Sequence, residues 1–166
     1  IHETIHDMGG NDTIDLSNYT ENTTISLIPG GVSEVGSNKL FWEGDSQQSG
    51  DYFVLSSKTD IEKYIGSSGN DDVTLNTSVI NDVNTGAGDD VIRDVLPTDI
   101  VSAGAGADTV YISYTTLDPD TSVSIDGGSE TTDFDWIVCD LAPDTEKDFT
   151  LCRTAFVNFE GFDFTD

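Results

Sequence analysis

The sequence predicts an all-β fold made of short strands. Runs of β-branched residues of four to six positions, such as residues 23–28 and 121–125, are bounded by turns rich in Gly, Asn and Asp. Helix-forming patterns are scarce, and part of the chain repeats with a period of nine residues. A length of 166 residues is typical of a single domain.

The repeat is clearest in three Gly-containing segments. In each, an Asp follows two residues after a Gly, and an aliphatic residue follows two residues after the Asp. The aligned aspartates are Asp71, Asp90 and Asp108. Two degenerate copies between them place Asn81 and Asp99 at the Asp position.

A nine-residue period has a simple structural meaning. Six residues can form a half-turn and three a short strand, so two repeats close one coil of about 18 residues. Stacked coils then form two parallel sheets around a thin core. Because successive strand side chains alternate between faces, the aliphatic positions are expected to point inward: Val73, Val83, Ile92, Val101 and Val110.

We expect one domain over residues 1–166. Residues 1–58 form flanking strands and an irregular loop between Gly30 and Lys58, residues 59–111 form the repeat coils, and residues 112–166 form a degenerate coil and closing strands. The aromatic tail Phe156–Phe162 is predicted to be a closing strand that caps the stack. The chain opens with Ile1 and is expected to be part of a longer protein.

Charge limits the classes of partner. The chain has 32 Asp and Glu against 6 Lys and Arg, a formal net charge of −26. Binding to nucleic acid or to an anionic membrane surface needs clustered cations and is therefore disfavoured. No apolar run approaches the roughly 18 residues of a membrane span. Eight Phe, five Tyr and two Trp argue against a disordered acidic chain, so a cation is the expected partner.

The repeats resemble the calcium-binding nonapeptide Gly-Gly-x-Gly-x-Asp-x-aliphatic-x of RTX proteins. Residues 3–17 resemble the entry to the C-terminal domain of serralysin-type metalloproteases, and residues 59–66 resemble the segment leading into that family's first coil. The resemblance implies a parallel β-roll flanked by β-sandwich-like strands. It also implies calcium binding, export from bacteria by a type I secretion system, and an extracellular location.

The chemistry of the turns agrees with this resemblance. Calcium takes about 6–8 oxygen ligands from carboxylates and main-chain carbonyls, and two turns on adjacent coils together offer enough. We expect one ion between Gly66–Asp71 and Thr85–Asp90, and a second between Thr85–Asp90 and Ala103–Asp108. The candidate ligands are Gly66, Ser68, Gly69, Asp71, Thr85, Ala87, Gly88, Asp90, Ala103, Ala105, Gly106 and Asp108. The opposite side of the coils carries Pro97 and is less suitable for binding an ion.

Two further turns are candidates for binding an ion. By resemblance, a third ion would join Asp7, Gly9 and Asp12 to Glu62, with Thr59 as a carbonyl donor. The sequence 126–128 followed by Asp133 is a last degenerate turn. Its extra residue breaks the nine-residue register, so this turn is a weaker candidate for an ion.

One motif matches a catalytic zinc site, but the rest of the sequence does not support catalysis. Residues 2–6 read His-Glu-x-x-His, the helical zinc motif of metalloproteases. A serralysin needs a third His, and this chain has only His2 and His6. We therefore predict a non-catalytic module, and a serralysin protease domain would lie outside this chain.

Aromatic and cysteine residues leave alternatives open. Trp42, Tyr52 and Trp136 could form a sugar-stacking platform, although burial in the core is favoured. An adhesive or carbohydrate-binding module stiffened by calcium, contacting a glycan or cell-surface partner, is therefore the alternative function. A disulfide between Cys139 and Cys152 is slightly favoured over two separate thiols in an oxidising exterior.

Overall fold

The computed structural model describes residues 2–7, 9–36, 51–113, 124–128, 133–140 and 156–165. This part of the chain contains strands and turns and no helix, which confirms the all-β prediction. The strands are β1 (His2–Ile5), β2 (Thr13–Asp15), β3 (Thr23–Ser26), β4 (Val32–Val35), β5 (Asp51–Leu55), β6 (Lys63–Ile65), β7 (Asp71–Thr74), β8 (Asp82–Asn84), β9 (Val91–Val95), β10 (Ile100–Ser102), β11 (Thr109–Ser113), β12 (Ser124–Asp126), β13 (Trp136–Asp140), β14 (Phe156–Val157) and β15 (Gly161–Thr165).

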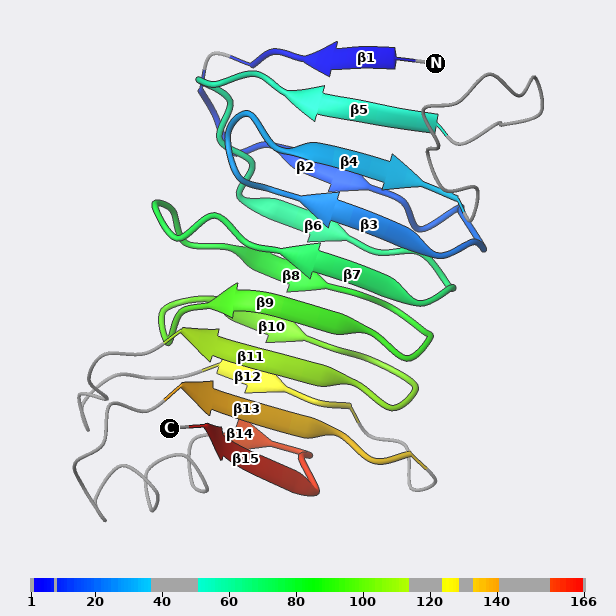
Figure 1. Cartoon of the computed structure of the whole chain (residues 1–166), viewed down its shortest axis with the longest axis vertical. Coiled ribbons are helices and arrows are strands. Elements are labelled where there is room, and N and C mark those ends of the chain that lie inside the picture. The colour runs from blue at the N-terminus through cyan, green and yellow to red at the C-terminus, as the bar shows by residue number, and fades with distance from the viewer. Residues whose placement is uncertain are drawn as a thin grey trace.

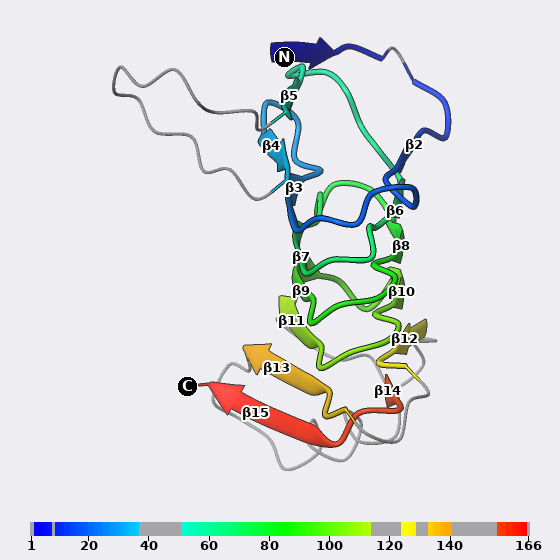
Figure 2. The ribbon, with the colours of Figure 1, turned by 90° about the vertical axis from the view of Figure 1, so that its right-hand side faces the viewer.

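The chain winds as a parallel β-roll, as predicted. Strands β2, β6, β8, β10, β12 and β14 form one sheet, and each is followed by a strand of the other sheet (Figure 1). Within the roll every neighbouring pair is parallel. Figure 2 shows the two sheets as columns of short strands joined by turns on both sides. All turns between the same two sheets therefore stack above one another.

The stack of coils extends beyond residues 59–111. Strand β2 pairs with β6, and β3 pairs with β7, so residues 13–26 add one coil at the N-terminal end. Strands β12 to β15 add two more at the C-terminal end. The segment predicted to be irregular contains β4 and β5, which pair antiparallel and extend the larger sheet toward β1.

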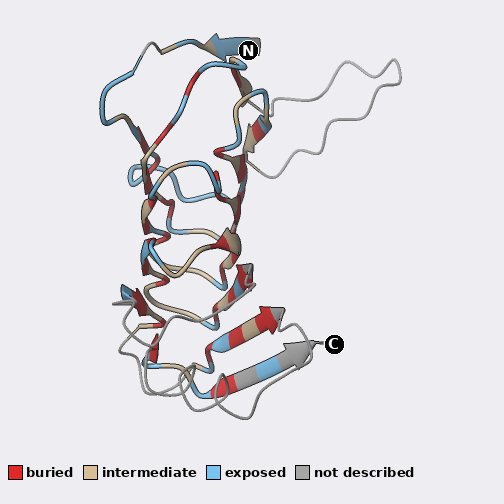
Figure 3. Ribbon diagram, turned by 90° about the vertical axis from the view of Figure 1, so that its left-hand side faces the viewer, coloured by how far each residue is buried: buried red, intermediate tan, exposed pale blue. Residues whose placement is uncertain are grey.

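The core is a thin double column of aliphatic side chains. The five predicted inward positions are confirmed, since Val73, Val83, Ile92, Val101 and Val110 are at most 2% exposed. Buried residues alternate with half-buried or exposed ones along most strands (Figure 3), as expected for side chains on opposite faces of a sheet. Each coil thus contributes only a few apolar side chains, and the polar turns at the two sides must be held together by other interactions.

Candidate functional site

Glycine shapes the turns that run from the smaller sheet to the larger one. Gly86, Gly88, Gly104 and Gly106 have φ angles of 103°, 123°, 108° and 122°, which side chains rarely adopt. A Cβ at Gly88 would lie 2.5 Å from the carbonyl oxygen of Gly69, and one at Gly106 would meet the carbonyl of Gly88. The turns therefore pack main chain against main chain. Carbonyl oxygens are thereby brought to the contact between turns of neighbouring coils, which we call the seam.

The aligned aspartates form a ladder along this side of the roll. The Asp71 N–H donates to Asp90 Oδ1 at 2.7 Å, and the Asp90 N–H donates to Asp108 Oδ1 at 2.8 Å. The Asp108 N–H donates to Asp135 Oδ1 at 2.9 Å. One carboxylate oxygen of Asp90, of Asp108 and of Asp135 thus supports the preceding turn, and the sequence-predicted aspartates lie together.

The second oxygen of two of these carboxylates has no hydrogen-bond donor in the described part of the chain. Asp90 Oδ2 and Asp108 Oδ2 are buried and unpaired, and neither residue is exposed to solvent. Burial raises the pKa of Asp90 to about 7 and that of Asp108 to about 8. Burying a charged carboxylate oxygen without a partner costs folding free energy. These two oxygens are therefore expected to bind a proton or a cation.

Asp71 differs from the other two, although its motif is the same. Its Oδ1 accepts hydrogen bonds from the hydroxyls of Thr23 and Ser67 at 2.8 and 2.9 Å. Its Oδ2 accepts from the Ser67 N–H at 2.8 Å and from the buried Tyr64 hydroxyl at 3.2 Å. Four protein donors therefore satisfy this carboxylate.

The opposite side of the roll is closed by hydrogen bonds of the same kind. Asp99 Oδ1 accepts from the N–H and the side-chain amide of Asn81 at 2.8 and 3.0 Å, and Asp99 Oδ2 accepts from the Leu96 N–H at 2.8 Å. Asp99 thus caps its turn, although the Asn81 Oδ1 atom on this side is also buried without a donor among the described residues.

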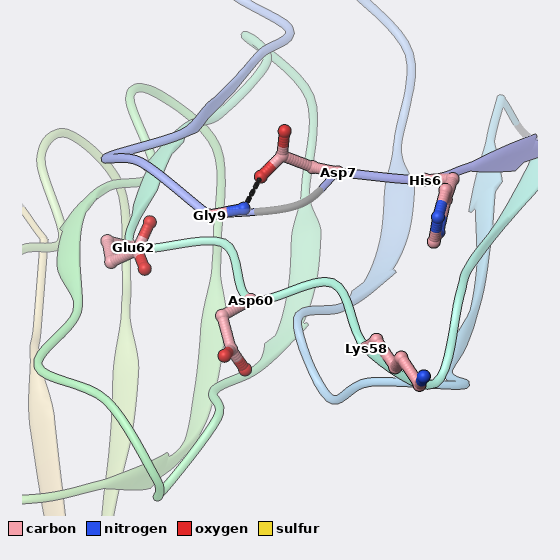
Figure 4. Close-up of a pocket in the computed structure, with 6 residues that line it drawn as sticks. All are labelled: His6, Asp7, Gly9, Lys58, Asp60 and Glu62. Atoms are coloured by element: carbon pink, nitrogen blue, oxygen red, sulfur yellow. Dashed lines mark hydrogen bonds between the residues drawn. The ribbon is translucent and has the colours of Figure 1, made fainter.

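The candidate N-terminal site gathers residues from two segments. The Asp7 N–H donates to the Thr59 hydroxyl at 3.1 Å, and the Asp12 N–H donates to Glu62 Oε2 at 2.9 Å. Asp7 also accepts from the Gly9 N–H at 2.8 Å (Figure 4). Contact with Asp7 and burial raise the pKa of Asp12, whose Oδ2 is buried and unpaired.

Asp7, Gly9 and Glu62 line a pocket together with His6, Lys58 and Asp60. Within the described residues, however, no three His, Cys, Asp or Glu side chains come together as a ready-made metal cluster. An ion bound among the described residues would therefore rely on main-chain carbonyls or water as well as on carboxylates, as calcium commonly does.

The other predicted ligands lie in the stacked turns. Ala87 and Ala105 form a bridge between neighbouring coils, and the Gly88 N–H donates to the Ala105 carbonyl at 2.8 Å. The Thr85 hydroxyl donates to the Ala103 carbonyl at 2.6 Å. In the first turn, a Cβ at Gly66 would meet the Thr85 carbonyl, whereas Ser68 is exposed and bonds to the Tyr19 carbonyl at 3.0 Å.

The sequence analysis missed the last two members of the ladder. Asp135 accepts from the Asp108 N–H, and its own N–H donates to Glu160 Oε2 at 2.9 Å. The signal was present, because Asp135 precedes Ile137 by two residues as Asp108 precedes Val110. The insertion after Gly128 concealed it.

The His-Glu-x-x-His motif does not have the geometry of a zinc site. Residues 2–5 form strand β1, paired with β5, and not a helix. Four residues of strand separate two Cα atoms by about 13 Å, so His2 and His6 are not adjacent as on a helix. The His6 Nδ1 atom lies 2.8 Å from the Ser56 hydroxyl.

Trp136 is not a core residue, contrary to the burial favoured by the sequence. It is 42% exposed, and its ring centroid lies 5.2 Å from that of Phe134, which is 46% exposed. Tyr52 is half-buried on β5, and Trp42 lies outside the described residues. Cys139 is buried on β13. The predicted bridge remains a prediction because Cys152 also lies outside the described residues.

A family model described as the peptidase M10 serralysin C terminal matches residues 2–140. The match covers the flanking strands and most of the stacked coils. Among curated proteins, no sequence matches the chain significantly. In the described residues no helix is long and apolar enough to cross a membrane.

Proposed function

Because the chain belongs to the serralysin C-terminal family, whose RTX repeats bind calcium, we propose that it is a non-catalytic, extracellular module that folds on binding calcium. The family supports a role as part of a larger secreted protein. The module would hold its coils together with ions, while any activity would belong to other parts of that protein.

The observation that carries this proposal is the pair of unpaired oxygens at Asp90 and Asp108. Each is buried on the aligned Asp of a stacked turn, and main-chain carbonyls also gather where these turns meet. Hard oxygen ligands of this kind suit calcium. These two carboxylates, with carbonyls of Thr85, Ala87 and Ala105 as candidates, are the residues that would hold the ion.

Two further ions remain proposals. An ion between the turns 66–71 and 85–90 would have to compete with the four donors that already satisfy Asp71. An ion at Asp7 and Asp12 is supported by the unpaired Asp12 Oδ2 and by the proximity of Glu62. In both places water or carbonyls would complete the coordination.

The mechanism we propose is coupled folding. Without calcium, stacked carboxylates repel one another and each coil buries few apolar side chains. Calcium neutralises the turns and links coil to coil, so that its binding free energy becomes folding free energy. In a cytosol low in calcium the chain would stay extended for export. It would fold outside the cell, where modules of this kind bind with a Kd of about 10⁻⁴–10⁻³ M.

A calcium titration followed by far-ultraviolet circular dichroism tests this function, with magnesium as the control. We expect calcium to strengthen the strand spectrum and to raise the melting temperature, and a chelator to lower both. Magnesium is smaller and demands a stricter octahedral geometry, so it should not substitute. A spectrum and melting temperature that ignore both calcium and chelator would refute the proposal.

A second candidate function is favoured by the exposed Phe134–Trp136 pair. Exposed aromatic rings on a rigid sheet can stack against a sugar, so the module could carry a glycan-binding surface. Binding on a glycan array in calcium, abolished by Trp136→Ala and retained in Tyr19→Ala, would support this function. Tyr19 is a suitable control because it is 48% exposed and belongs to a different turn.

A further inference from the structure

Two exposed aromatic rings, those of Trp136 and Tyr111, lie on the outer face of the larger sheet near its C-terminal edge. Strands β11, β13 and β15 are neighbours there (Figure 1). On β13 the alternate residues Ile137 and Cys139 are buried, so Trp136 points away from the core. This face is the outside of a sheet and not the seam between turns, so the two rings are separate from the candidate calcium ligands.

A glycine on the neighbouring strand provides the space in which the indole lies. Trp136 pairs with Gly161 across β13 and β15. A Cβ at Gly161 would lie 2.5 Å from Cδ2 of Trp136 and 2.8 Å from Cε1 of the exposed Phe134. Both rings therefore lie against the main chain of β15, as aromatic rings do when they cover an edge glycine. Because both residues are nevertheless exposed, each ring keeps a side that faces solvent.

Tyr111 extends this aromatic surface, and a cation that is already paired holds its ring. Tyr111 lies on β11, one diagonal step from Trp136 and about 8 Å away. The Arg93 guanidinium carbon lies 5.0 Å from the Tyr111 ring centroid. Arg93 also donates to both carboxylate oxygens of Asp72, at 2.9 and 3.2 Å. Its charge is thus compensated within the protein and is not offered to an anionic ligand.

An exposed carboxylate lies on the same face as the indole. Asp163 follows Gly161 by two residues and pairs with Val138, which follows Trp136 by two residues, so all four share one face. Within the described part of the chain, no hydrogen bond or ion pair engages the Asp163 carboxylate. With a net charge of −26 on the whole chain, this face attracts cations and repels anions.

We propose that this surface binds an amino sugar, that is, a saccharide with a free, protonated amine. The apolar face of the sugar ring would stack on Trp136, and the ammonium group would pair with Asp163 at the edge of the aromatic surface. A uronic or sulfated sugar would instead meet the negative charge of the module, with Arg93 already paired. This inference rests on the glycan-binding function proposed above and narrows it to one class of sugar.

Isothermal titration calorimetry with a short glucosamine oligomer and with its fully N-acetylated form tests the inference. Both ligands present the same sugar rings, but only the first carries positive charges. In excess calcium and mildly acidic buffer, we expect the amine form to bind about 5- to 30-fold more tightly, through one exposed ion pair and one cation–π contact. Asp163→Asn should reduce this preference to about two- to fivefold and leave the affinity for the N-acetylated form unchanged.

Glu3→Gln is the matched control for charge, because a strongly acidic chain attracts cations over its whole surface. Glu3 is exposed on β1, which lies at the opposite end of the larger sheet from β15. This variant should keep the wild-type preference for the amine form. Equal losses of preference in Asp163→Asn and Glu3→Gln would show that the attraction is nonspecific and would overturn the site.

Gly161→Ala tests the aromatic surface without changing a ring or a charge. Its Cβ would displace the rings of Trp136 and Phe134, so both oligomers should bind about three- to tenfold more weakly. The response of the circular dichroism spectrum to calcium should remain, which shows that the variant is folded. Unchanged binding of both oligomers by the folded variant would contradict the placement of the sugar on these rings.

The outcomes separate this inference from the function on which it rests. If the wild-type chain binds no glycan on the array, the glycan-binding function itself fails. If it binds glycans but binds the N-acetylated oligomer as tightly as the amine form, or binds neither oligomer, only the assignment to amino sugars is overturned.

Discussion

Replacing Asp90 by Asn should have opposite effects on stability with and without calcium. In a chelator the variant should be more stable than the wild type, because it removes a buried charge whose Oδ2 has no hydrogen-bond donor among the described residues. In excess calcium the variant should be less stable, because a ligand is lost. Asn can still accept the Asp71 N–H through its side-chain oxygen, so the ladder itself is retained.

The magnitude follows from the pKa of Asp90, which burial raises from 3.8 to about 7. One pKa unit corresponds to about 1.4 kcal/mol, so ionising this group in the folded chain costs up to about 4 kcal/mol. Solvent screening reduces this to roughly 2 kcal/mol, and the new amide N–H₂ offsets about 1 kcal/mol of the gain. We therefore expect a stabilisation of about 1 kcal/mol in chelator at pH 8. At calcium concentrations of about 100 times Kd, loss of the ion should cost about 2.7 kcal/mol.

Urea denaturation at pH 8, followed by circular dichroism, measures both values. Asp99→Asn is the matched control, because Asp99 occupies the aligned position on the other side of the roll and both of its oxygens accept N–H donors. The change in the free energy of unfolding caused by Asp99→Asn should be the same with and without calcium. Destabilisation of Asp90→Asn in chelator, or a calcium dependence equal to that of Asp99→Asn, would contradict our reading of the unpaired oxygens.

Two further predictions concern pH and the turn glycines. Because the folded pKa of Asp108, about 8, lies above its ordinary value of 3.8, calcium-free stability should be greatest below about pH 4 and fall as the pH rises to about 8. Excess calcium should remove this loss, and urea midpoints that are flat with pH in chelator would contradict it. Gly106→Ala places a Cβ against the Gly88 carbonyl at a φ of 122° and should cost about 2–3 kcal/mol in urea denaturation. Gly30→Ala, at a φ of 84° with nothing within 4 Å, should cost only about 1 kcal/mol, and equal costs would show that the carbonyl contact does not matter.

The coils were predictable because their determinants are local. A Gly at a strained turn position, an Asp and an inward aliphatic residue recur at fixed spacing, and the two-residue alternation of a strand fixes which side chain is buried. Val73, Ile92 and Val110 are buried for this reason. The first coil was less visible, because β2 and β3 reach their partners β6 and β7 only after the excursion through β4 and β5. Pairing across such a distance leaves no periodic signal in the sequence.

The exposure of Trp136 shows a different limit. A β-rich segment around a large aromatic residue normally predicts a buried ring. Here Ile137 takes the inward position opposite Val110, so its neighbour Trp136 must face outward. Which residue of the strand points inward, and not the size of the aromatic side chain, therefore determines the face on which Trp136 lies. The nine-residue register could have assigned Trp136 correctly had it been carried across the insertion before Asp133.

The three aligned aspartates show that a metal-binding motif specifies the backbone before it specifies the metal. Asp71, Asp90 and Asp108 all occur in the same turn geometry, and the carboxylates of the last two each cap the N–H of the preceding turn. They differ in what surrounds the remaining oxygens. Thr23, on the added N-terminal coil, and Tyr64, on the strand before the turn 66–71, complete the shell of Asp71. At the N-terminal end of the repeat, protein donors thus satisfy the Asp71 carboxylate. In the next two turns, one oxygen of Asp90 and one of Asp108 have no donor among the described residues. The Asp71 turn therefore has less need of a cation than the turns of Asp90 and Asp108.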